Sequence, residues 1–172
     1  MNVLLGITGC IAAYKTPELV RRLRERGHSV RCILTANASR LVTEHALATV
    51  SGHPVASDMW SADARIAHID RSQWCDCLLV APATANALAK FALGLADDLL
   101  STTFLALPPD KRVHIAPAMN TVMWHKPIVQ QHVATLEAAG CERLGPVAGE
   151  LACGDAGIGA MLAPEQIAAA LD

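Results

Sequence analysis

Aromatic residues are scarce in this sequence of 172 residues, where Phe, Trp and Tyr together make up only 3%. So few rings exclude a surface on which successive bases stack, and they leave backbone and aliphatic groups to hold any flat ligand. Neither sign of charge predominates, because 14 Lys and Arg residues stand against 16 Asp and Glu residues. Without a charged face, nucleic acid and anionic lipid are excluded as partners, and a small molecule is the expected ligand.

Long hydrophobic runs are also missing. The longest apolar stretches, such as Cys77–Ala83, are far shorter than the ~20 residues of a membrane span. The apolar residues at 3–5 follow Met1 and Asn2 directly, without the basic segment of an export signal. These features predict a cytoplasmic protein that does not enter a membrane.

The six cysteines include no C-x-x-C pair, which is the spacing typical of zinc sites and of thioredoxin-like redox sites. Cys75 and Cys77 stand only as C-x-C. We therefore expect no metal site. Because no export signal is present, we also expect the cysteines to be free thiols.

Hydrophobic residues make up 52% of the chain, which is enough for a sizeable core in a single domain spanning residues 1–172. Apolar runs predict strands at 2–8, 29–35, 77–81, 112–116 and 142–144. Helical patterns lie between and after them, at 12–26, 37–50, 87–107 with an interruption near Gly94, 128–139 and 164–171. This alternation predicts a three-layer, flavodoxin-like α/β fold, a Rossmann-type parallel sheet with helices on both faces.

Two segments show no clean periodicity. Residues 55–73 are predicted to form a long functional loop with short pieces of structure, and the glycine-rich residues 145–161 to form turns. Cys153 lies in the second segment, which is suited to a loop that folds over a ligand and delivers one thiol. A plain surface loop with an incidental cysteine is the alternative.

Ligands of such sheets bind at the carboxyl ends of the strands, which selects residues 8–10, 35–37, 82–86 and 117–120. The first of these turns suits a phosphate, because Gly9 permits close approach, Thr8 carries a hydroxyl, and a helix follows. An ordinary tight turn would have the same sequence.

Polar side chains at the other strand ends also have two interpretations. Thr84 and Asn86 suit a flat heterocycle or a phosphate, although Thr84 is also a typical helix cap. Asn120 can bind both a carboxylate and an amide, or cap the helix that follows it. His68 is a candidate acid or base, although a lone histidine is more often structural.

Several motifs together resemble the homo-oligomeric flavin-containing cysteine decarboxylases over nearly the whole chain. They are TGCIAAYK at 8–15, HI at 68–69, APATAN at 81–86, ADDLLST at 96–102, PAMNTVMW at 117–124 and ACGD at 152–155. The P-x-M-N-x-x-M-W pattern is shared with peptidyl-cysteine decarboxylases. Its combination with A-C-G-D-x-G-x-G resembles most closely the phosphopantothenoylcysteine decarboxylases, known as the decarboxylase domain of the bifunctional coenzyme A biosynthesis flavoprotein.

The resemblance implies an FMN-dependent carboxy-lyase that converts phosphopantothenoylcysteine to phosphopantetheine. It implies that His68, Asn120 and Cys153 are catalytic. The residues implied to bind FMN are Gly9, Cys10, Thr35, Pro82, Thr84, Asn86, Asp98, Ser101 and Met119. The residues implied to bind the cysteine-derived substrate are Asn120, Met123, Ala152, Gly154 and Asp155.

The implied chemistry explains why these groups are needed. Direct loss of CO2 from an N-acylated cysteine leaves a carbanion without an electron sink. Hydride transfer from the CH2–SH unit to a flavin creates a thioaldehyde, and decarboxylation then gives an enethiolate. His68 would act as acid or base near the thiol, or orient it. Cys153 would protonate the enethiolate as the hydride returns, whereas an enzyme that stops at the enethiol needs no such acid.

The resemblance also implies a trimer or dodecamer with shared active sites, and a phosphopantothenoylcysteine synthetase that is fused or separate. The chain departs from the family pattern G-x-G-R-M, because Ala160 stands in place of the arginine, so the substrate tail and the oligomer size stay open. One alternative is a peptidyl-cysteine decarboxylase that forms a C-terminal enethiol. Another is a non-catalytic flavin-binding regulatory relative, against which His68 and Asn120 argue. A flavin prenyltransferase would not need the PAMNTVMW motif.

Overall fold

The structure is a computed structural model that describes residues 1–60, 67–150, 154 and 156–172. Its main sheet has five parallel strands in the order β2-β1-β3-β4-β5. The strands are β1 (Asn2–Ile7), β2 (Ser29–Leu34), β3 (Cys77–Ala83), β4 (Arg112–Pro117) and β5 (Glu142–Arg143). The chain passes outward from β1 to β2 and then returns across β1 to β3. The strand order therefore reverses between β1 and β3, as in flavodoxin-like folds.

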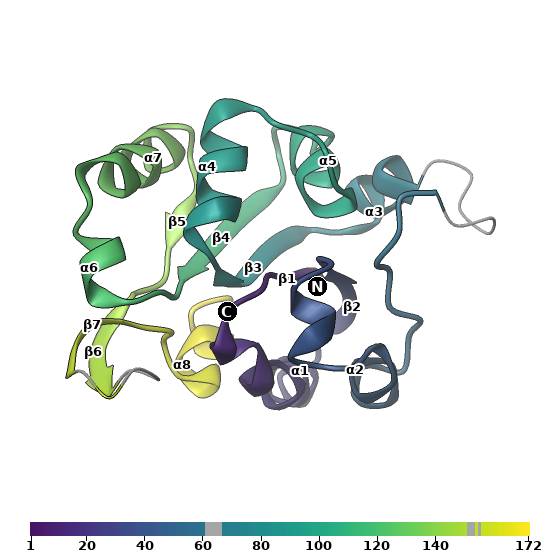
Figure 1. The fold of residues 1–172 in the computed structure, drawn as a ribbon. Helices are drawn as coiled ribbons and strands as arrows, with labels where there is room; N and C mark the ends of the chain where they lie inside the picture. Colours follow the sequence, from purple (N-terminus) through teal and green to yellow (C-terminus); the bar gives the residue numbers. More distant parts are fainter. Residues whose placement is uncertain (61–66, 151–153, 155) are drawn as a thin grey trace.

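Helices cover both faces of this sheet (Figure 1). One face carries α1 (Thr16–Glu25), α2 (Glu44–Ser51) and α8 (Pro164–Ala169), and the other carries α3 (Ala67–Trp74), α4 (Ala85–Leu93), α5 (Leu99–Leu105) and α7 (Pro127–Ala138). Alternate residues of β1 enter the two cores, with Leu5 on the α1 side and Leu4 on the α4 side. The predicted three-layer fold is confirmed. Within the described ranges, no helix is long and apolar enough to cross a membrane.

Two of the predicted helices begin with separate short 3-10 turns. Residues Ile11–Lys15 form one such turn before α1, and Ala38–Arg40 form another before α2. Pro17 lies in the first turn of α1, where its missing N–H costs no helical hydrogen bond. Thr43 begins α2, because its side chain accepts the Ala46 N–H at 3.1 Å.

The interruption predicted near Gly94 is present and divides the segment into α4 and α5. Gly94 ends α4 with a φ of +69°, a left-handed conformation that glycine adopts without steric cost. Asp98 begins α5 through a reciprocal capping box with Ser101. These caps place the start of α5 beside α4.

The two segments without periodicity contain regular structure. In residues 55–73, the short pieces of structure that were expected include the helix α3, which fully buries only Ala67 and Ser72 and so leaves no apolar period in the sequence. Residues 145–161 are not simply turns, because β6 (Val147–Glu150) and β7 (Ala156–Ala160) form an antiparallel hairpin. Glycine-rich strands have weak intrinsic propensity and form where tertiary packing supports them.

The five cysteines that the structure describes are unpaired thiols, and they are Cys10, Cys32, Cys75, Cys77 and Cys141. Burial raises the pKa of Cys32 and of Cys77 to about 12. Because the thiolate is the reactive form, these two side chains act as small core hydrophobes.

Candidate functional site

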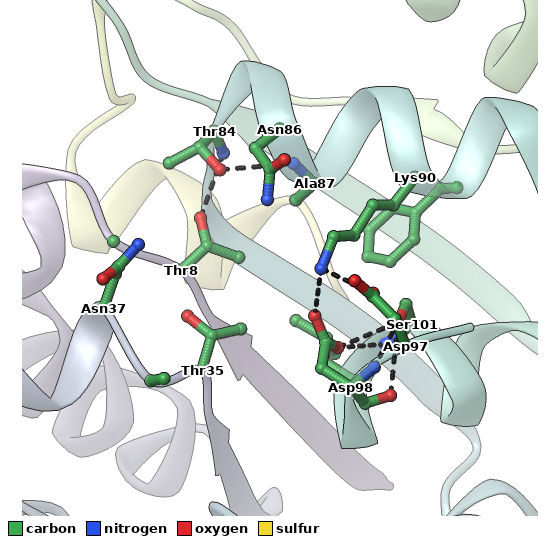
Figure 2. Close-up of a pocket in the computed structure, with 14 residues that line it drawn as sticks. Thr8, Thr35, Asn37, Thr84, Asn86, Ala87, Lys90, Asp97, Asp98 and Ser101 are labelled. Atoms are coloured by element: carbon green, nitrogen blue, oxygen red, sulfur yellow. Dashed lines mark hydrogen bonds and ion pairs between the residues drawn. The ribbon is translucent and has the colours of Figure 1, made fainter. Parts of the chain in front are cut away.

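A cavity of about 320 Å³ opens where β1, β2 and β3 end, beside α4 and α5. It therefore lies at the carboxyl ends of the strands and at the point where the strand order reverses, as expected for a ligand site in this fold. Its lining residues are Thr8, Gly9, Thr35, Ala36, Asn37, Thr84, Asn86, Ala87, Lys90, Phe91, Asp97, Asp98, Leu100 and Ser101. Figure 2 shows neutral hydroxyl and amide groups on one side of the cavity and charged groups on the other.

Thr8 joins the ends of β1 and β3. Its hydroxyl donates to the Pro82 carbonyl at 2.7 Å and accepts the Thr84 N–H at 3.0 Å. The residue is only 2% exposed. The hydroxyl hydrogen is therefore directed at Pro82, not at a phosphate as the sequence suggested. Thr8 instead fixes the turn after β1 against the start of α4.

Gly9 is the point of closest approach between the turns that follow β1 and β2. A Cβ atom at this position would overlap the Cβ of Asn37 and lie 3.2 Å from the Asn37 carbonyl carbon. Any side chain here would push the two turns apart, because backbone as well as side-chain atoms lie in the way. Glycine is thus required for this wall of the cavity to close.

The start of α4 forms a second wall. Thr84 caps the helix, since its hydroxyl accepts the Ala87 N–H at 3.3 Å, so the capping alternative is observed. Thr84 and Asn86 also line the cavity. The positive end of the α4 dipole therefore faces the ligand space on the neutral side, which favours an anion there.

A cluster of three charged residues forms the opposite wall. The Lys90 ammonium lies 2.6 Å from Asp97 and 2.7 Å from Asp98. Burial alone would lower the pKa of Lys90, but its hydrogen bonds to both carboxylates outweigh that effect and raise the pKa. Burial alone would raise the pKa of Asp98, but hydrogen bonds from Lys90 and Ser101 hold that pKa below its usual range. The Lys90 and Asp98 side chains are therefore charged at neutral pH.

Most residues predicted to bind the cofactor line this cavity. They are Gly9, Thr35, Thr84, Asn86, Asp98 and Ser101. Cys10, Pro82 and Met119 lie outside the lining that the described residues form. Pro82 contributes through its carbonyl, which holds Thr8, and Met119 is 8% exposed.

Three lining residues were not singled out from the sequence, namely Ala87, Lys90 and Phe91. The signal for Lys90 was its position four residues after Asn86, which places both on one face of a helix. That face could be assigned only with the helix bounds known. Leu100 belongs to the ADDLLST motif at 96–102, which carries part of the resemblance.

The predicted catalytic residues lie on separate elements. His68 is partly buried in α3, which packs against α5. Asn120 caps the short helix α6 (Thr121–Trp124), accepting the Val122 N–H at 2.8 Å, so the capping alternative is again observed. Neither residue is among the described residues that line the cavity.

Two residues that were predicted to bind the substrate, Ala152 and Asp155, fall outside the described residues, as does the predicted catalytic residue Cys153. Gly154 has a left-handed φ of +86°, and Met123 in α6 is 46% exposed. Their roles stay predictions from the sequence.

The hairpin packs against the segment that holds Asn120. The Met119 N–H donates to the Gly159 carbonyl at 3.0 Å. A Cβ at Gly159 would overlap the Met119 carbonyl oxygen, and a Cβ at Gly157 would overlap the Thr121 hydroxyl. Glycine at both positions therefore allows β7 to lie directly on the start of α6. This contact links residues 119–121 to β7, the strand that follows the ACGD motif in sequence.

Replacing Gly159 with alanine should loosen this contact. The added methyl group meets a backbone carbonyl that cannot rotate away, and overpacking of this kind costs about 1–3 kcal/mol. We expect the Met119 amide to exchange its hydrogen at least tenfold faster, measured by hydrogen exchange. Gly149→Ala is the matched control in the same hairpin, because its Cβ would lie 3.2 Å from the Ala160 Cβ. Equal exchange rates in the two variants would contradict the proposed contact.

The cavity suits an amphipathic cofactor. Its neutral polar side and the α4 terminus fit a phosphate and hydroxyl groups, and Ala87, Phe91 and Leu100 supply apolar surface for a flat ring. The fold and the site therefore define an α/β protein that binds a nucleotide-like cofactor at the switch point of its sheet.

The chain belongs to the Flavoprotein family, whose model matches residues 1–172. Its cofactor is accordingly a flavin.

Similar proteins support this assignment. The chain is 45% identical over 170 residues to a coenzyme A biosynthesis bifunctional protein CoaBC of Vibrio vulnificus (strain YJ016), covering 98% of this chain and 42% of the relative. It is 44% identical over 165 residues to the CoaBC protein of Escherichia coli (strain K12), covering 95% of this chain and 40% of the relative. The chain thus spans about two fifths of the length of these curated relatives.

Solved structures are similar over almost the full chain. A PPC decarboxylase mutant complexed with pantothenoylaminoethenethiol matches with a TM-score of 0.91 and 32% identity, covering 99% of this chain and 95% of that one. The FMN-binding protein AtHal3 matches with a TM-score of 0.86 and 32% identity, covering 99% of this chain and 94% of that one. The FMN-dependent cysteine decarboxylase SpaF matches with a TM-score of 0.85 and 32% identity, covering 99% of this chain and 95% of that one.

Proposed function

We propose that this chain is an FMN-dependent decarboxylase that converts phosphopantothenoylcysteine to phosphopantetheine, a step of coenzyme A biosynthesis. One structural observation carries the proposal beyond flavin binding. β7, the strand that follows the ACGD motif in sequence, packs through Gly157 and Gly159 onto the segment that holds Asn120. The segment that holds Asn120 is thereby in contact with a strand more than 30 positions farther along the chain.

The similar proteins support the same substrate. The PPC decarboxylase neighbour carries a cysteine-to-serine mutation and holds an aminoethenethiol, which is a decarboxylated and still unsaturated cysteine derivative. The curated relatives are named for coenzyme A biosynthesis. FMN as the particular flavin is supported by the cofactor of AtHal3 and SpaF and by the phosphate-compatible side of the cavity.

A bound flavin would supply reversible hydride acceptance from the substrate CH2–SH unit. Asn120 would bind the substrate carboxylate and amide. Its Oδ1 accepts the Val122 N–H, which fixes the side-chain rotamer at the start of α6. A fixed amide orients the carboxylate so that the bond to the departing CO2 is held in one geometry.

Proton transfers belong to His68 and Cys153 in this proposal. His68 would take the proton of the thiol as the CH2 group loses its hydride, or orient that thiol. After CO2 leaves, Cys153 would protonate the enethiolate carbon while the hydride returns, giving the saturated thiol. The balance is one CO2 lost and no net oxidation, so the reaction needs no external oxidant.

Assembly and location are part of the same proposal. A trimer or dodecamer with shared active sites is supported by His68 and Asn120, which are absent from the described lining of the cavity in one chain. A fused or separate phosphopantothenoylcysteine synthetase is supported by the length and the bifunctional name of the curated relatives. We place the protein in the cytoplasm, where coenzyme A synthesis would use it.

A peptidyl-cysteine decarboxylase is the second candidate. Ala160, the last residue of β7, replaces the arginine that would help bind a substrate phosphate, and a neutral residue there favours a peptide tail.

One assay separates these functions. The purified chain is incubated with phosphopantothenoylcysteine and, separately, with a peptide that ends in cysteine, and CO2 release and product mass are followed. We expect CO2 only from the first substrate, with a saturated thiol as product. A product two hydrogens lighter, formed from the peptide, would favour the second candidate, and absence of any bound or bindable flavin would contradict both.

A further inference from the structure

Lys90 is held rigidly at the cavity wall, although no motif pointed to it. Its side chain is 17% exposed, and its ammonium contacts Asp97 at 2.6 Å and Asp98 at 2.7 Å. An ammonium group has three N–H donors, and these contacts use two of them. Figure 2 shows the ammonium beside both carboxylates, farther along α4 than Thr84 and Asn86.

The position of Lys90 is fixed from both helices. Asp98 is itself held by capping α5, because its Oδ1 accepts the Ser101 N–H at 2.8 Å. Phe91, the next residue of α4, stacks on Phe104 of α5 with ring centroids 4.4 Å apart. A lysine held in this way loses little further entropy when it binds a ligand.

The charges of the cluster decide which part of a flavin fits beside it. One ammonium and two carboxylates leave an excess of negative charge, which repels a phosphate. The neutral side of the cavity, with the α4 N-terminus, has no such repulsion. The pyrimidine edge of a flavin ring carries carbonyl acceptors next to an N–H donor. An ammonium beside a carboxylate offers the complementary donor and acceptor.

We propose that Lys90 contacts the pyrimidine edge of the flavin ring, held in place by Asp97 and Asp98, and that its charge sets the reduction potential of the cofactor. This inference rests on the flavin cofactor and not on the identity of the substrate. Reduction places additional negative charge on the pyrimidine side of the ring. A neighbouring cation stabilises that charge, and a neighbouring carboxylate opposes it.

The test uses two substitutions in the whole chain, one that removes a positive charge and one that removes a negative charge. Lys90→Met removes the positive charge, and Asp97→Asn removes a negative charge from a side chain that is 66% exposed. We expect Lys90→Met to weaken binding of reduced flavin at least tenfold more than binding of oxidised flavin. For a two-electron couple, this corresponds to a fall of about 30 mV in midpoint potential. Asp97→Asn should shift the potential upward.

Binding of FMN and of riboflavin locates the contact. If Lys90 contacts the ring, Lys90→Met weakens both by the same factor, measured by fluorescence titration. Loss of FMN affinity alone would place Lys90 at the phosphate and overturn the proposal, as would an unchanged potential. Lys90→Arg should keep the potential near the wild-type value, and circular dichroism reports whether Lys90→Met folds. If it does not, Asp97→Asn alone decides, because its potential must rise.

One further control completes the design. Lys111→Met, in the turn that precedes β4 at the opposite end of the sheet, should leave both affinity and potential unchanged. No cysteine substrate is present in these measurements. The Lys90 result therefore stands whether or not the chain decarboxylates phosphopantothenoylcysteine, and failure of the decarboxylation assay would affect only the proposed function.

Discussion

A chain with alanine in place of Gly9 should purify without bound flavin. The added Cβ would overlap the Cβ of Asn37 and crowd the Asn37 backbone, so the turns after β1 and β2 must separate. These turns form the wall of the cavity at the end of the sheet. A wall displaced at one end loses several contacts to the same ligand together, so we expect at least a hundredfold loss of flavin affinity, measured by titration of the purified protein with FMN.

The Gly9 prediction has a compensating variant. Asn37→Gly removes the Cβ that the new methyl group meets, although the Asn37 backbone remains in place. The double variant Gly9→Ala with Asn37→Gly should therefore recover part of the lost affinity. Asn37→Gly alone measures what the Asn37 side chain itself contributes. Wild-type affinity in the Gly9→Ala protein would show that the close approach is not needed for the cofactor.

Replacing Cys153 with serine should change the product more than the substrate. A serine hydroxyl is a much weaker acid than a thiol, so protonation of the enethiolate should slow by about 10²–10⁴-fold, the usual contribution of a positioned acid. Loss of CO2 precedes that step and should continue. In a single turnover without oxygen, we expect a product two hydrogens lighter than the saturated thiol, identified by mass spectrometry.

The Cys153 experiment contains its own control. CO2 release in the first turnover reports on binding, oxidation and decarboxylation, so a variant with a damaged site would lose that signal too. A fully saturated product formed at an undiminished rate would show that Cys153 is not the acid. Loss of both CO2 and product would instead point to a role for Cys153 in closing the site over the substrate.

Much of the candidate cofactor site was predictable, because it depends on where strands end. Buried parallel strands are read from short apolar runs, and their carboxyl ends meet at one edge of the sheet. Gly9, Thr35 and Thr84 follow such runs directly, and all three line the cavity. Lys90 was not predictable in this way, since its place depends on how α4 lies against α5.

Whether a single polar residue caps a helix or faces a ligand could be decided only from the tertiary structure. Thr84 and Asn120 each carried two interpretations, and both are helix caps in the structure. For Thr84 the two interpretations coincide, because the cap also lines the cavity. A side-chain oxygen that caps one N–H can face a ligand only if the helix starts at the ligand site.

The sequence by itself determined the layers of this protein, its flavin family and the strand ends at which a ligand meets the sheet, because these follow from periodicity and from motifs of consecutive residues. Only the tertiary structure decided that Thr8 joins two strand ends, that Lys90 is held between Asp97 and Asp98, and that Gly157 and Gly159 bring a hairpin onto the start of α6. Each of these depends on contacts between segments that are distant along the chain or on the angle between two helices. The A-C-G-D-x-G-x-G pattern contains both glycines, but it does not show which atoms they lie against, since those atoms belong to a distant part of the chain.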